Sequence, residues 1–454
     1  MSGHSPLPPA FINRMQDSLG LDSMSDFIES IESIPPVSIR LHPFKSSQYK
    51  KDSNSFDPIP WCKSGYYLKQ RPIFTLDPGF HSGGYYVQEA SSMLIEYAMQ
   101  LALKEFIEPK ILDLCAAPGG KSTLILSLLN QHGLLVSNET IQSRVAPLSH
   151  NLIKWGYLNQ VITNGDPERF ALLSNFFDIV LIDAPCSGEG LFRKDISSRN
   201  EWSESNTNQC ALRQRRILKH AIEALNPGGY LIYSTCTYNP SENIDQVCYL
   251  NSLGLQSIKM QELISFGLEM QEKENGIGYQ AYPHKVKGEG FFISLLQKTS
   301  DSINQRISSS SIEWSETPNV MEQYLSIDGL SCFKHQDSFH VFPEKLQREL
   351  EEIRSRIKIV HAGLECGSYK HNDFIPHHAL SQYYQLIPEV PAIEIADKSA
   401  LDYLKGNALL NEKNEIGYHL AMNQSQKMGW VKAIRGRLNN LYPHAYRIKG
   451  NFNS

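Results

Sequence analysis

Two cysteines, each at the end of a predicted strand, are the residues of this sequence best suited to covalent chemistry. Cys186 follows the apolar run FDIVLIDAP (177–185), and Cys236 ends the run YLIYSTC (230–236). A thiolate is a strong nucleophile when its surroundings lower its pKa. Asp183, three residues before Cys186, offers an acid that can act by hydrogen bonding. A single cysteine is most often a small buried hydrophobic residue, but this set predicts a site for nucleophilic catalysis.

Modification of a pyrimidine ring at C5 is the chemistry that needs such a set. C5 of cytosine is too weak a nucleophile to attack a methyl sulfonium directly. A thiolate that adds to C6 makes C5 electron-rich, and after methylation a base removes the C5 proton and the sulfur leaves. We expect Asp183 to stabilise the ring at N3 or N4. Lys121 is expected to orient Asp183 or to favour a nearby thiolate.

A strand, a glycine-containing turn and a helix are predicted over ILDLCAAPGGKSTLILSLL (111–129). Small residues let the backbone approach a ligand, and a helix N-terminus offers unpaired N–H groups. Glu139 ends the next strand and can hold ribose hydroxyls, whereas Asp166 ends the third strand on the adenine side. These features favour S-adenosylmethionine as the cofactor. Its expected loop contacts are Cys115, Ala116, Ala117, Pro118, Gly119, Gly120 and Lys121.

A nucleoside triphosphate is the alternative ligand for this turn. Gly120-Lys121-Ser122 followed later by IVLID imitates a P-loop and its Mg²⁺-binding aspartate. A P-loop, however, needs a glycine five residues before its Gly-Lys-Ser/Thr, and Cys115 stands there. The sequence therefore favours the methyl donor over ATP or GTP, and titration with both would separate the two hypotheses.

The elements that must position these residues alternate between short apolar strands and helices. Fully apolar strands separated by helices predict an α/β fold whose parallel sheet is covered on both faces. One helix should run through Leu94, Tyr97 and Leu101, with Ser91 or Ser92 as its N-cap. The strands are expected within 111–116, 133–139, 160–166, 177–185, 230–236 and 290–298.

Bulk properties define the class of protein and its division into domains. The chain has 454 residues and a net charge of −5, so contacts with a polyanion must come from local basic patches. Eight cysteines without a CxxC pair predict neither a disulfide framework nor a metal site. No signal peptide or membrane span is evident, and we expect a cytoplasmic location without membrane contact. The expected regions are 1–90, 91–298, a linker at 299–319, and 320–454.

The sequence resembles the RNA (cytosine-5)-methyltransferase family of the Sun type. The resemblance implies a Rossmann-like S-adenosylmethionine-dependent methyltransferase core. LPPAFINRMQDSLG (7–20) and SIRLHPFK (38–45) are similar to the F-type branch that modifies 16S ribosomal RNA, which implies a small N-terminal RNA-binding region and an α+β, PUA-like RNA-binding domain at 320–454. The motifs that carry the resemblance are YYVQEASSM (85–93), DLCAAPGGKS (113–122), SNE (137–139), DAPCSGEGLFRKD (183–195), YSTCTYNPSENIDQV (233–247) and PHKVKGEGFF (283–292).

The resemblance also implies roles for the two cysteines. Cys236 corresponds to the nucleophile of the family, and Cys186 to the cysteine that assists release from the product. The loop 115–121 with Glu139, Asp166 and Asp183 corresponds to the contacts with S-adenosylmethionine. DNA cytosine-C5 methyltransferases would instead use Cys186 as nucleophile.

Ribosomal RNA, free or within the assembled subunit, is the expected partner of a monomeric enzyme. The segment 426–450 is basic and contains Trp430, Tyr442 and Tyr446, so its cations could contact phosphates while its rings stack on bases. Transfer RNA is the alternative substrate, and a non-catalytic RNA-binding assembly factor is the alternative class. The intact cysteines and Asp183 argue against loss of catalysis. The expected RNA contacts are Arg193, Lys194, Lys432, Arg435 and Arg437.

Overall fold

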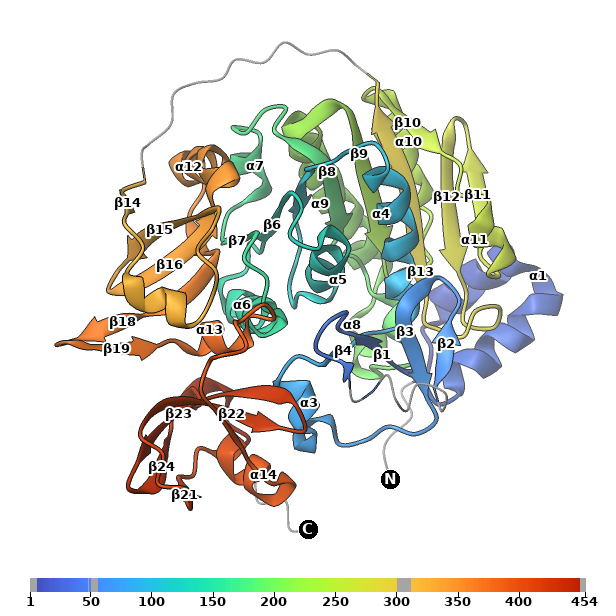
Figure 1. Cartoon of the computed structure of the whole chain (residues 1–454). Helices are drawn as coiled ribbons and strands as arrows, with labels where there is room; N and C mark the ends of the chain where they lie inside the picture. Colours follow the sequence, from blue (N-terminus) through green and yellow to red (C-terminus); the bar gives the residue numbers. More distant parts are fainter. Residues whose placement is uncertain (1–5, 48, 50–55, 300–311, 450–454) are drawn as a thin grey trace.

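One large sheet forms the centre of the protein (Figure 1). The structure is a computed structural model that describes residues 6–47, 49, 56–299 and 312–449. Five neighbouring strands of the sheet run parallel in the order β9-β8-β5-β6-β7. They are β5 (Lys110–Asp113), β6 (Leu134–Asn138), β7 (Gln160–Thr163), β8 (Phe177–Asp183) and β9 (Leu225–Thr235). The parallel sheet predicted from the apolar runs is therefore confirmed.

Antiparallel strands extend the sheet beyond β9. The strand β13 (Phe291–Lys298) pairs with β9 and with β10 (Leu255–Ile258). The strands β12 (Gly276–Ala281) and β11 (Glu269–Lys273) then complete this side of the sheet. Figure 1 shows them on the side of the parallel strands away from the elements that follow residue 312.

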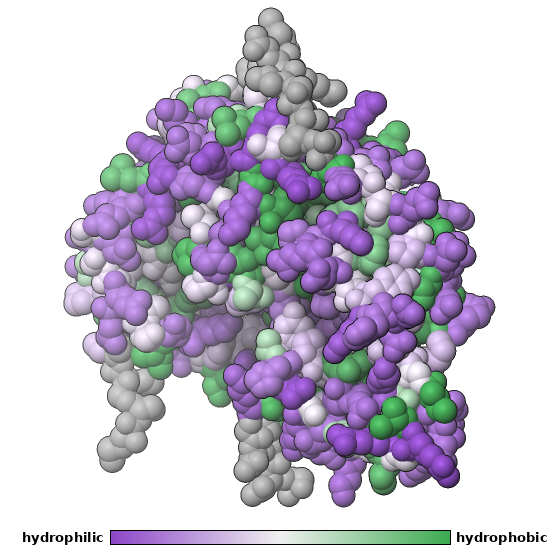
Figure 2. All heavy atoms as spheres, turned by 90° about the vertical axis from the view of Figure 1, so that its left-hand side faces the viewer, coloured by the Kyte–Doolittle hydropathy of each residue, from purple (hydrophilic) through white to green (hydrophobic). Residues whose placement is uncertain are grey.

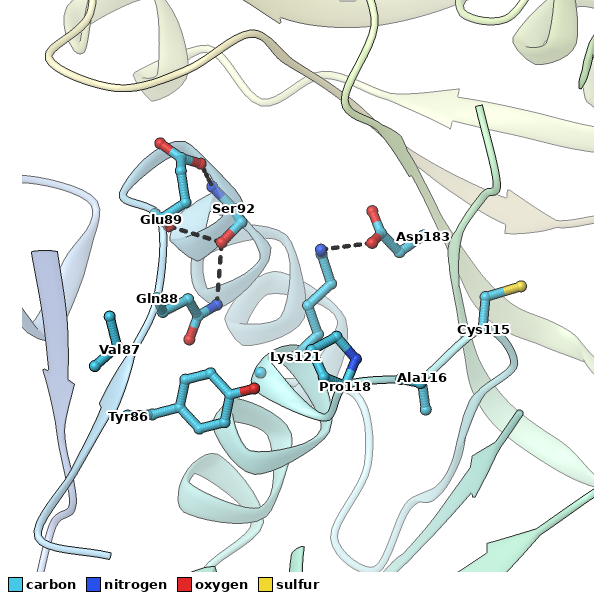
Figure 3. Close-up of a pocket in the computed structure, with 12 residues that line it drawn as sticks. Tyr86, Val87, Gln88, Glu89, Ser92, Cys115, Ala116, Pro118, Lys121 and Asp183 are labelled. Carbon is cyan, nitrogen blue, oxygen red and sulfur yellow. Dashed lines mark hydrogen bonds and ion pairs between the residues drawn. The ribbon is translucent and has the colours of Figure 1, made fainter. Parts of the chain in front are cut away.

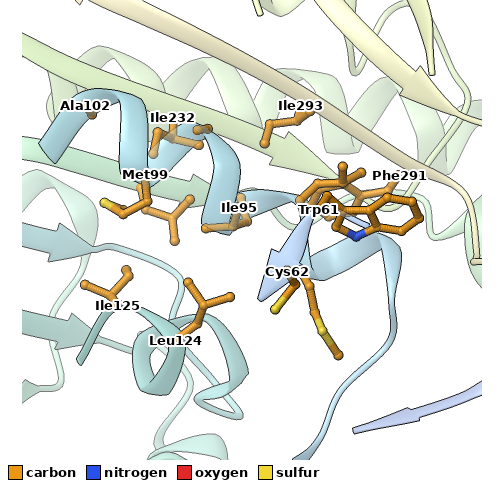
Figure 4. Packing of buried hydrophobic residues seen from close by; sticks show 14 of the residues in the cluster. Trp61, Cys62, Ile95, Met99, Ala102, Leu124, Ile125, Ile232, Phe291 and Ile293 are labelled. Carbon is orange, nitrogen blue, oxygen red and sulfur yellow. The ribbon is translucent and has the colours of Figure 1, made fainter. Parts of the chain in front are cut away.

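Both faces of the sheet are covered, and its parallel strands bury apolar side chains on each face. Ile111 and Leu135 belong to one core cluster, whereas their neighbours Leu112 and Val136 belong to the cluster on the other face, as the two-residue period of a strand requires. The first face packs against α4 (Ile95–Leu103), α5 (Gly120–Leu129) and α6 (Gln142–Trp155) (Figure 4). The other packs against α9 (Glu204–Ala224) and α10 (Ile244–Ser252).

The helix predicted to run through Leu94 is present, but another side chain than the predicted one caps its N-terminus. Ser91 and Ser92 lie in a 3-10 turn, and α4 continues from it. The side chain of Glu89 accepts hydrogen bonds from the backbone N–H groups of Ser91 and Ser92, each at 2.8 Å. The expected serine cap is therefore wrong, because a longer carboxylate side chain two residues earlier satisfies the free N–H groups.

The N-terminal region consists of a helix and a small sheet that contact different parts of the core. Helix α1 (Pro9–Glu32) buries Phe11 and Phe27 against Phe192 and Tyr238, which lie just beyond the two cysteines of interest. The small sheet has the strand order β2-β3-β1-β4. Its strands are β1 (Val37–Leu41), β2 (Asp57–Ile59), β3 (Cys62–Leu68) and β4 (Tyr85–Val87), and the short helix α3 (Pro78–His81) precedes β4.

A buried carboxyl group near the end of α1 makes stability depend on pH. The side chain of Glu289 is 4% exposed, and neither carboxylate oxygen accepts a hydrogen bond from a residue that the structure describes. Burial raises the pKa of Glu289 to about 7, against the lowering effect of Arg193. Because the pKa of Glu289 is raised in the folded protein, the stabilisation that its protonated form gives is complete below about pH 4.5. This stabilisation is lost as the pH rises through about 7.

Glu289→Gln should therefore stabilise the protein at pH 8 and not at pH 4.5. The expected gain in the free energy of unfolding at pH 8 is about 2 kcal/mol, because the variant no longer buries an ionised carboxylate there. Thermal unfolding of both proteins at the two pH values measures the effect. An equal difference in melting temperature at both pH values would contradict this linkage.

The C-terminal half begins earlier than expected. Residues 300–311 of the expected linker lie outside the described residues, but Ile312 is buried in the core, and β14 (Trp314–Ser315) pairs with β15 (Leu330–His335). The boundary at 319 is therefore wrong, because Ile312 and Trp314 already pack against the folded core. This sheet has the order β14-β15-β16-β18-β19 and continues with β16 (Ser338–Pro343), β18 (Leu364–Lys370) and β19 (Asp373–Pro376).

The region 320–454 is also not one unit. After α12 (Gln347–Arg356), the strand β17 (Ile359–Ala362) joins the central sheet and pairs antiparallel with β7. Helix α13 (His378–Gln382) then leads to a last sheet of order β20-β22-β23-β24-β21 with helix α14 (Asp397–Lys405). The strands of this last sheet are β20 (Ala392–Glu394), β21 (Leu409–Asn411), β22 (Gly417–Asn423), β23 (Gln426–Ile434) and β24 (Gly436–Asn440).

The last sheet docks on the N-terminal region. Ser82 donates to the side-chain oxygen of Gln426 at 2.6 Å, and the amide of Gln426 donates to the carbonyl of Lys45 at 2.7 Å. Figure 2 shows the face that lies at the left of Figure 1, where hydrophilic side chains predominate and hydrophobic ones lie between them in small groups. Among the described helices, none combines the length and the apolar character needed to cross a bilayer.

Candidate active site

The residues singled out in the sequence meet at one edge of the central sheet. The parallel strands all present their carboxyl ends there, so Cys115, Glu139, Asp166, Asp183 and Cys236 lie within reach of one another. They line a cavity of about 580 Å³, at the place where open α/β sheets bind ligands. Further lining residues include Ala117, Arg144, Pro185, Cys186, Arg213 and Arg216.

The two cysteines face each other in this cavity. The Sγ atoms of Cys186 and Cys236 are 3.3 Å apart, and both side chains are partly exposed. The hydrogen bond to Cys236, burial and the negative charge of Glu242 together hold the pKa of Cys186 well above its ordinary value. The two sulfurs are close enough to share one hydrogen bond, in which either S–H can be the donor.

The expected contact between Lys121 and Asp183 is present. The Nζ atom of Lys121 lies 2.7 Å from one carboxylate oxygen of Asp183, and the hydroxyl of Ser234 donates to the other at 2.8 Å. Burial lowers the pKa of Lys121, but the charge and hydrogen bond of Asp183 outweigh burial and raise it. Figure 3 shows Lys121 reaching from α5 towards Asp183. Asp183 lines this cavity, and Lys121 holds its carboxylate from the side of a neighbouring, smaller cavity.

The two acids at the ends of β6 and β7 occupy different environments. Glu139 is buried, and it accepts the N–H of Ile141 at 2.8 Å while Arg144 lies 3.4 Å from its other oxygen. Asp166 caps the short helix α7 (Pro167–Phe170) through the N–H of Glu168, and Arg216 lies 2.5 Å from it. Although burial opposes this, these two partners hold the pKa of Asp166 below its ordinary value.

A second, smaller cavity of about 190 Å³ lies on the other side of Lys121 (Figure 3). It shares Cys115, Ala117 and Asp183 with the larger cavity, so one elongated ligand could enter both. The N-terminal region supplies the opposite wall. Its contribution consists of Tyr86, Val87, Gln88 and Glu89 together with Ser92.

A buried arginine connects this wall to the glycine-containing loop. Arg40 is fully buried and donates to the side-chain oxygen of Gln88 at 2.9 Å. The same guanidinium donates to the hydroxyl of Thr123 at 2.6 Å and to the carbonyl of Gly120 at 3.2 Å. The first turn of α5 is therefore fixed against the N-terminal region. The loop between β5 and α5 leads into this turn and contains Ala116, Pro118 and Gly119.

Several residues that line the cavities were missed by reasoning from the sequence. Arg213 and Arg216 were not predicted as site residues, yet their spacing of three residues places both on the face of α9 that lines the larger cavity. Arg144 carried no signal, because an arginine in a helix is most often solvated. Gln88, Glu89 and Ser92 belong to the motif YYVQEASSM (85–93), whose sequence alone does not indicate a role for these side chains.

The expected RNA contacts divide into three kinds. The guanidinium of Arg193 donates to the carbonyls of Ile34 at 2.8 Å and of Ser33 at 3.4 Å, and its side chain is 10% exposed, so most of it is taken up by contacts within the protein and its contact with RNA stays a prediction. Lys432 lies 3.6 Å from Asp373 and over the ring of Tyr418. Exposed side chains remain at Lys194, Arg435 and Arg437.

The aromatic residues of the C-terminal segment do not form a stacking surface. Trp430 and Tyr442 are 1% and 2% exposed, and they belong to core clusters. The ring of Tyr446 stacks on His150 of α6, with 3.8 Å between the ring centroids. The predicted stacking on bases is therefore wrong for these rings, because they hold the last sheet together and dock it on the core.

Comparison with known proteins decides the family. Residues 98–297 match the family described as 16S rRNA methyltransferase RsmB/F, and residues 7–90 match the N-terminal domain of 16S rRNA methyltransferase RsmF. Residues 390–448 match the methyltransferase RsmF PUA domain. Ribosomal RNA small subunit methyltransferase F of Shewanella oneidensis is 30% identical over 465 residues, which cover 96% of each chain. The chain belongs to the ribosomal RNA small subunit methyltransferase F family.

Other relatives agree over similar lengths. Ribosomal RNA small subunit methyltransferase F of Erwinia tasmaniensis is 29% identical over 463 residues, or 96% of each chain. A solved methyltransferase homolog protein from Pyrococcus horikoshii is 26% identical, with a TM-score of 0.53 over 64% of this chain and all of that one. A second structure, titled NSun6 from Pyrococcus horikoshii with SFG, has the same TM-score over 65% of this chain at 19% identity and shows the shared fold.

Membership in the small subunit methyltransferase F family resolves three expectations. The chain is an RNA methyltransferase that depends on S-adenosylmethionine, which decides against the nucleoside triphosphatase and the non-catalytic assembly factor. The PUA domain corresponds to the last sheet, 390–448, and not to the whole region from 320. The Rossmann-like core and the N-terminal domain are confirmed.

Proposed function

We propose that the enzyme methylates C5 of a cytosine in 16S ribosomal RNA, through a transient covalent bond between Cys236 and C6 of that base. The observation that carries the proposal is the sulfur pair, 3.3 Å apart in the cavity that also contains Asp183. A methyltransferase that acts on an oxygen or on an exocyclic nitrogen has no need of two facing thiols. Addition to a pyrimidine ring needs one thiol to attack and gains from a second that assists release.

The residues around the larger cavity fit S-adenosylmethionine. This cofactor supplies an electrophilic methyl group when it is bound. Glu139 offers its carboxylate to ribose hydroxyls, and Asp166 with Arg216 borders the side where the adenine would lie. The backbone of the loop 115–121 and the ammonium of Lys121 are available to the amino-acid end through the smaller cavity.

Each cysteine has one part in the proposed reaction. The thiolate of Cys236 donates an electron pair to C6, which makes C5 nucleophilic enough to take the methyl group. A solvent base then removes the C5 proton, the C5–H electron pair restores the ring double bond, and the electrons of the C6–S bond return to Cys236. Cys186 assists this departure by donating its S–H to the leaving sulfur.

Asp183 and Lys121 would stabilise the ring while it is attached. The carboxylate of Asp183 accepts a hydrogen bond from the amino group at N4, and the ammonium of Lys121 lies beside it to offset negative charge on the ring. A base inside a helix cannot reach this edge of the sheet, so the target cytosine must leave its stack. The exposed Lys194, Arg435 and Arg437 are candidates for contacts with the RNA backbone.

Identification of the methylated nucleoside tests the proposal. The enzyme is incubated with methyl-labelled S-adenosylmethionine and with small ribosomal subunits, or their naked RNA, from cells that lack it. Digestion to nucleosides and mass spectrometry should place the label in 5-methylcytidine of 16S RNA, and a parallel reaction with transfer RNA should give none. Label in another nucleoside contradicts the cytosine-C5 chemistry, and label in transfer RNA alone contradicts the substrate.

A further inference from the structure

The loop between β9 and α10 contains a carboxylate that is bound to the loop of Cys186. Glu242 is fully buried, and its oxygens accept the backbone N–H of Ser187 at 2.8 Å and the hydroxyl of Ser187 at 2.5 Å. Gln214 of α9 donates to it at 3.1 Å, whereas the hydroxyl of Thr237 is farther away at 3.5 Å. Since Ser187 directly follows Cys186, the main contacts of Glu242 fix the backbone next to that sulfur.

The next residue is bound in the same way to the loop of Cys236. Asn243 is fully buried, its oxygen accepts the hydroxyl of Thr235 at 2.5 Å, and its amide donates to the carbonyl of Thr237 at 2.9 Å. These two threonines flank Cys236 in the chain. The amide of Asn243 also donates to Gln280 of β12 at 3.0 Å, which anchors it to the sheet.

We propose that Glu242 and Asn243 are positioning residues that divide the reaction between them, Glu242 serving release through Cys186 and Asn243 serving attack through Cys236. The inference rests on the proposed function. Two consecutive buried side chains determine the positions of two loops, and thereby the separation of the two sulfurs. Misplacement of a reacting group by about 1 Å can cost on the order of 10²-fold in rate.

The charge of Glu242 gives it a second influence on the same cysteine. Burial raises the pKa of Glu242 to about 7, and above that pH its negative charge is among the causes that raise the pKa of Cys186, after the hydrogen bond to Cys236 and burial. Glu242→Gln keeps the shape of the side chain but removes this charge and one of the two acceptor oxygens. The substitution should thus displace Cys186 and lower the pKa of its thiol. The contacts of Asn243 with the loop of Cys236 should remain.

Opposite effects on the covalent intermediate test the division of roles. With ribosomal RNA and S-adenosylmethionine, Glu242→Gln should form the adduct at nearly the normal rate and then accumulate it, with turnover reduced about tenfold or more. Asn243→Ala should form the adduct and the methylated product more slowly by a common factor of about 10–100, without accumulation. Denaturing gels of single-turnover reactions measure the adduct, and labelled methyl groups measure the product.

Asp245→Asn is the matched control, because it removes a carboxylate from the same segment that pairs with Lys273 and not with a cysteine loop. It should leave both readouts unchanged. Thermal unfolding and the affinity for S-adenosylmethionine show whether each variant is folded. If Glu242→Gln does not fold, Ser187→Ala removes its shortest hydrogen bond and should accumulate adduct in the same way.

The inference is overturned if Glu242→Gln and Asn243→Ala lose adduct and product equally, or if neither changes them. Failure of the proposed function is a different result, namely that Cys186→Ala forms no adduct and that the product contains no 5-methylcytidine. The two failures are therefore distinguishable within one set of experiments.

Discussion

Cys236→Ala will reduce methyl transfer by roughly 10⁴-fold or more, a loss typical of removing a covalent nucleophile. Without a thiolate to add at C6, C5 of cytosine does not become electron-rich, and no other cysteine lining the cavity takes its place. In this variant the neighbouring Cys186 loses its hydrogen bond to residue 236, but burial and the charge of Glu242 still raise its pKa and so disfavour its thiolate. Transfer of labelled methyl groups to ribosomal RNA measures the loss.

Two comparisons make the result specific. Cys248→Ala changes a partly exposed cysteine on α10 that lies outside both cavities, and it should retain full activity. The affinity of Cys236→Ala for S-adenosylmethionine should stay within a few-fold of that of the unsubstituted enzyme. If Cys236→Ala still turns over at more than about a tenth of the normal rate, the sulfur at 236 is not the nucleophile.

Cys186→Ala will instead stop the enzyme after a single turnover. Attack by Cys236 and transfer of the methyl group do not need the second thiol, but release does, because the departing sulfur then lacks its hydrogen-bond donor at 3.3 Å. We expect about one methyl group per enzyme molecule and a covalent complex that survives denaturation. A ribonuclease-sensitive band of reduced mobility on a denaturing gel measures it.

The double variant Cys186→Ala/Cys236→Ala separates this complex from adventitious cross-linking and should give no such band. The reverse pattern is equally informative. If Cys236→Ala traps RNA while Cys186→Ala only loses activity, the roles of the two thiols are exchanged. Cys186 would then be the nucleophile, as the comparison with DNA cytosine-C5 methyltransferases would imply.

The core and its site could be predicted because their signals are local. Each parallel strand is a short run rich in apolar residues, and Asp183 and Cys236 stand at the ends of two of them, so the edge of the sheet where they meet followed from strand direction. The helix cap was not predictable in the same way. Glu89 took the place of the expected Ser91 or Ser92, since the helical turn begins earlier and the serines themselves donate their N–H groups to its carboxylate.

Residues that act through long-range contacts were out of reach. Arg40 meets Thr123 across 83 residues, and nothing near either position signals the contact. Arg193 was expected to contact RNA because it follows the motif of Cys186, yet the backbone that follows α1 accepts its hydrogen bonds and leaves its side chain 10% exposed. In the segment 426–450, the pattern of basic and aromatic residues is compatible both with rings that stack on bases and with rings that form a core. Only the tertiary packing distinguishes these two roles.

The strand β17 has a consequence for dividing the chain into parts. It comes from the C-terminal half, yet it closes the open side of β7 in the catalytic sheet. A fragment cut after residue 298 would present the N–H and C=O groups of β7 to other molecules, and exposed strand edges of this kind promote self-association. The region between the catalytic domain and the PUA domain thus also covers an edge of the catalytic sheet. The two domains therefore cannot be separated into independent modules without a substitute for β17.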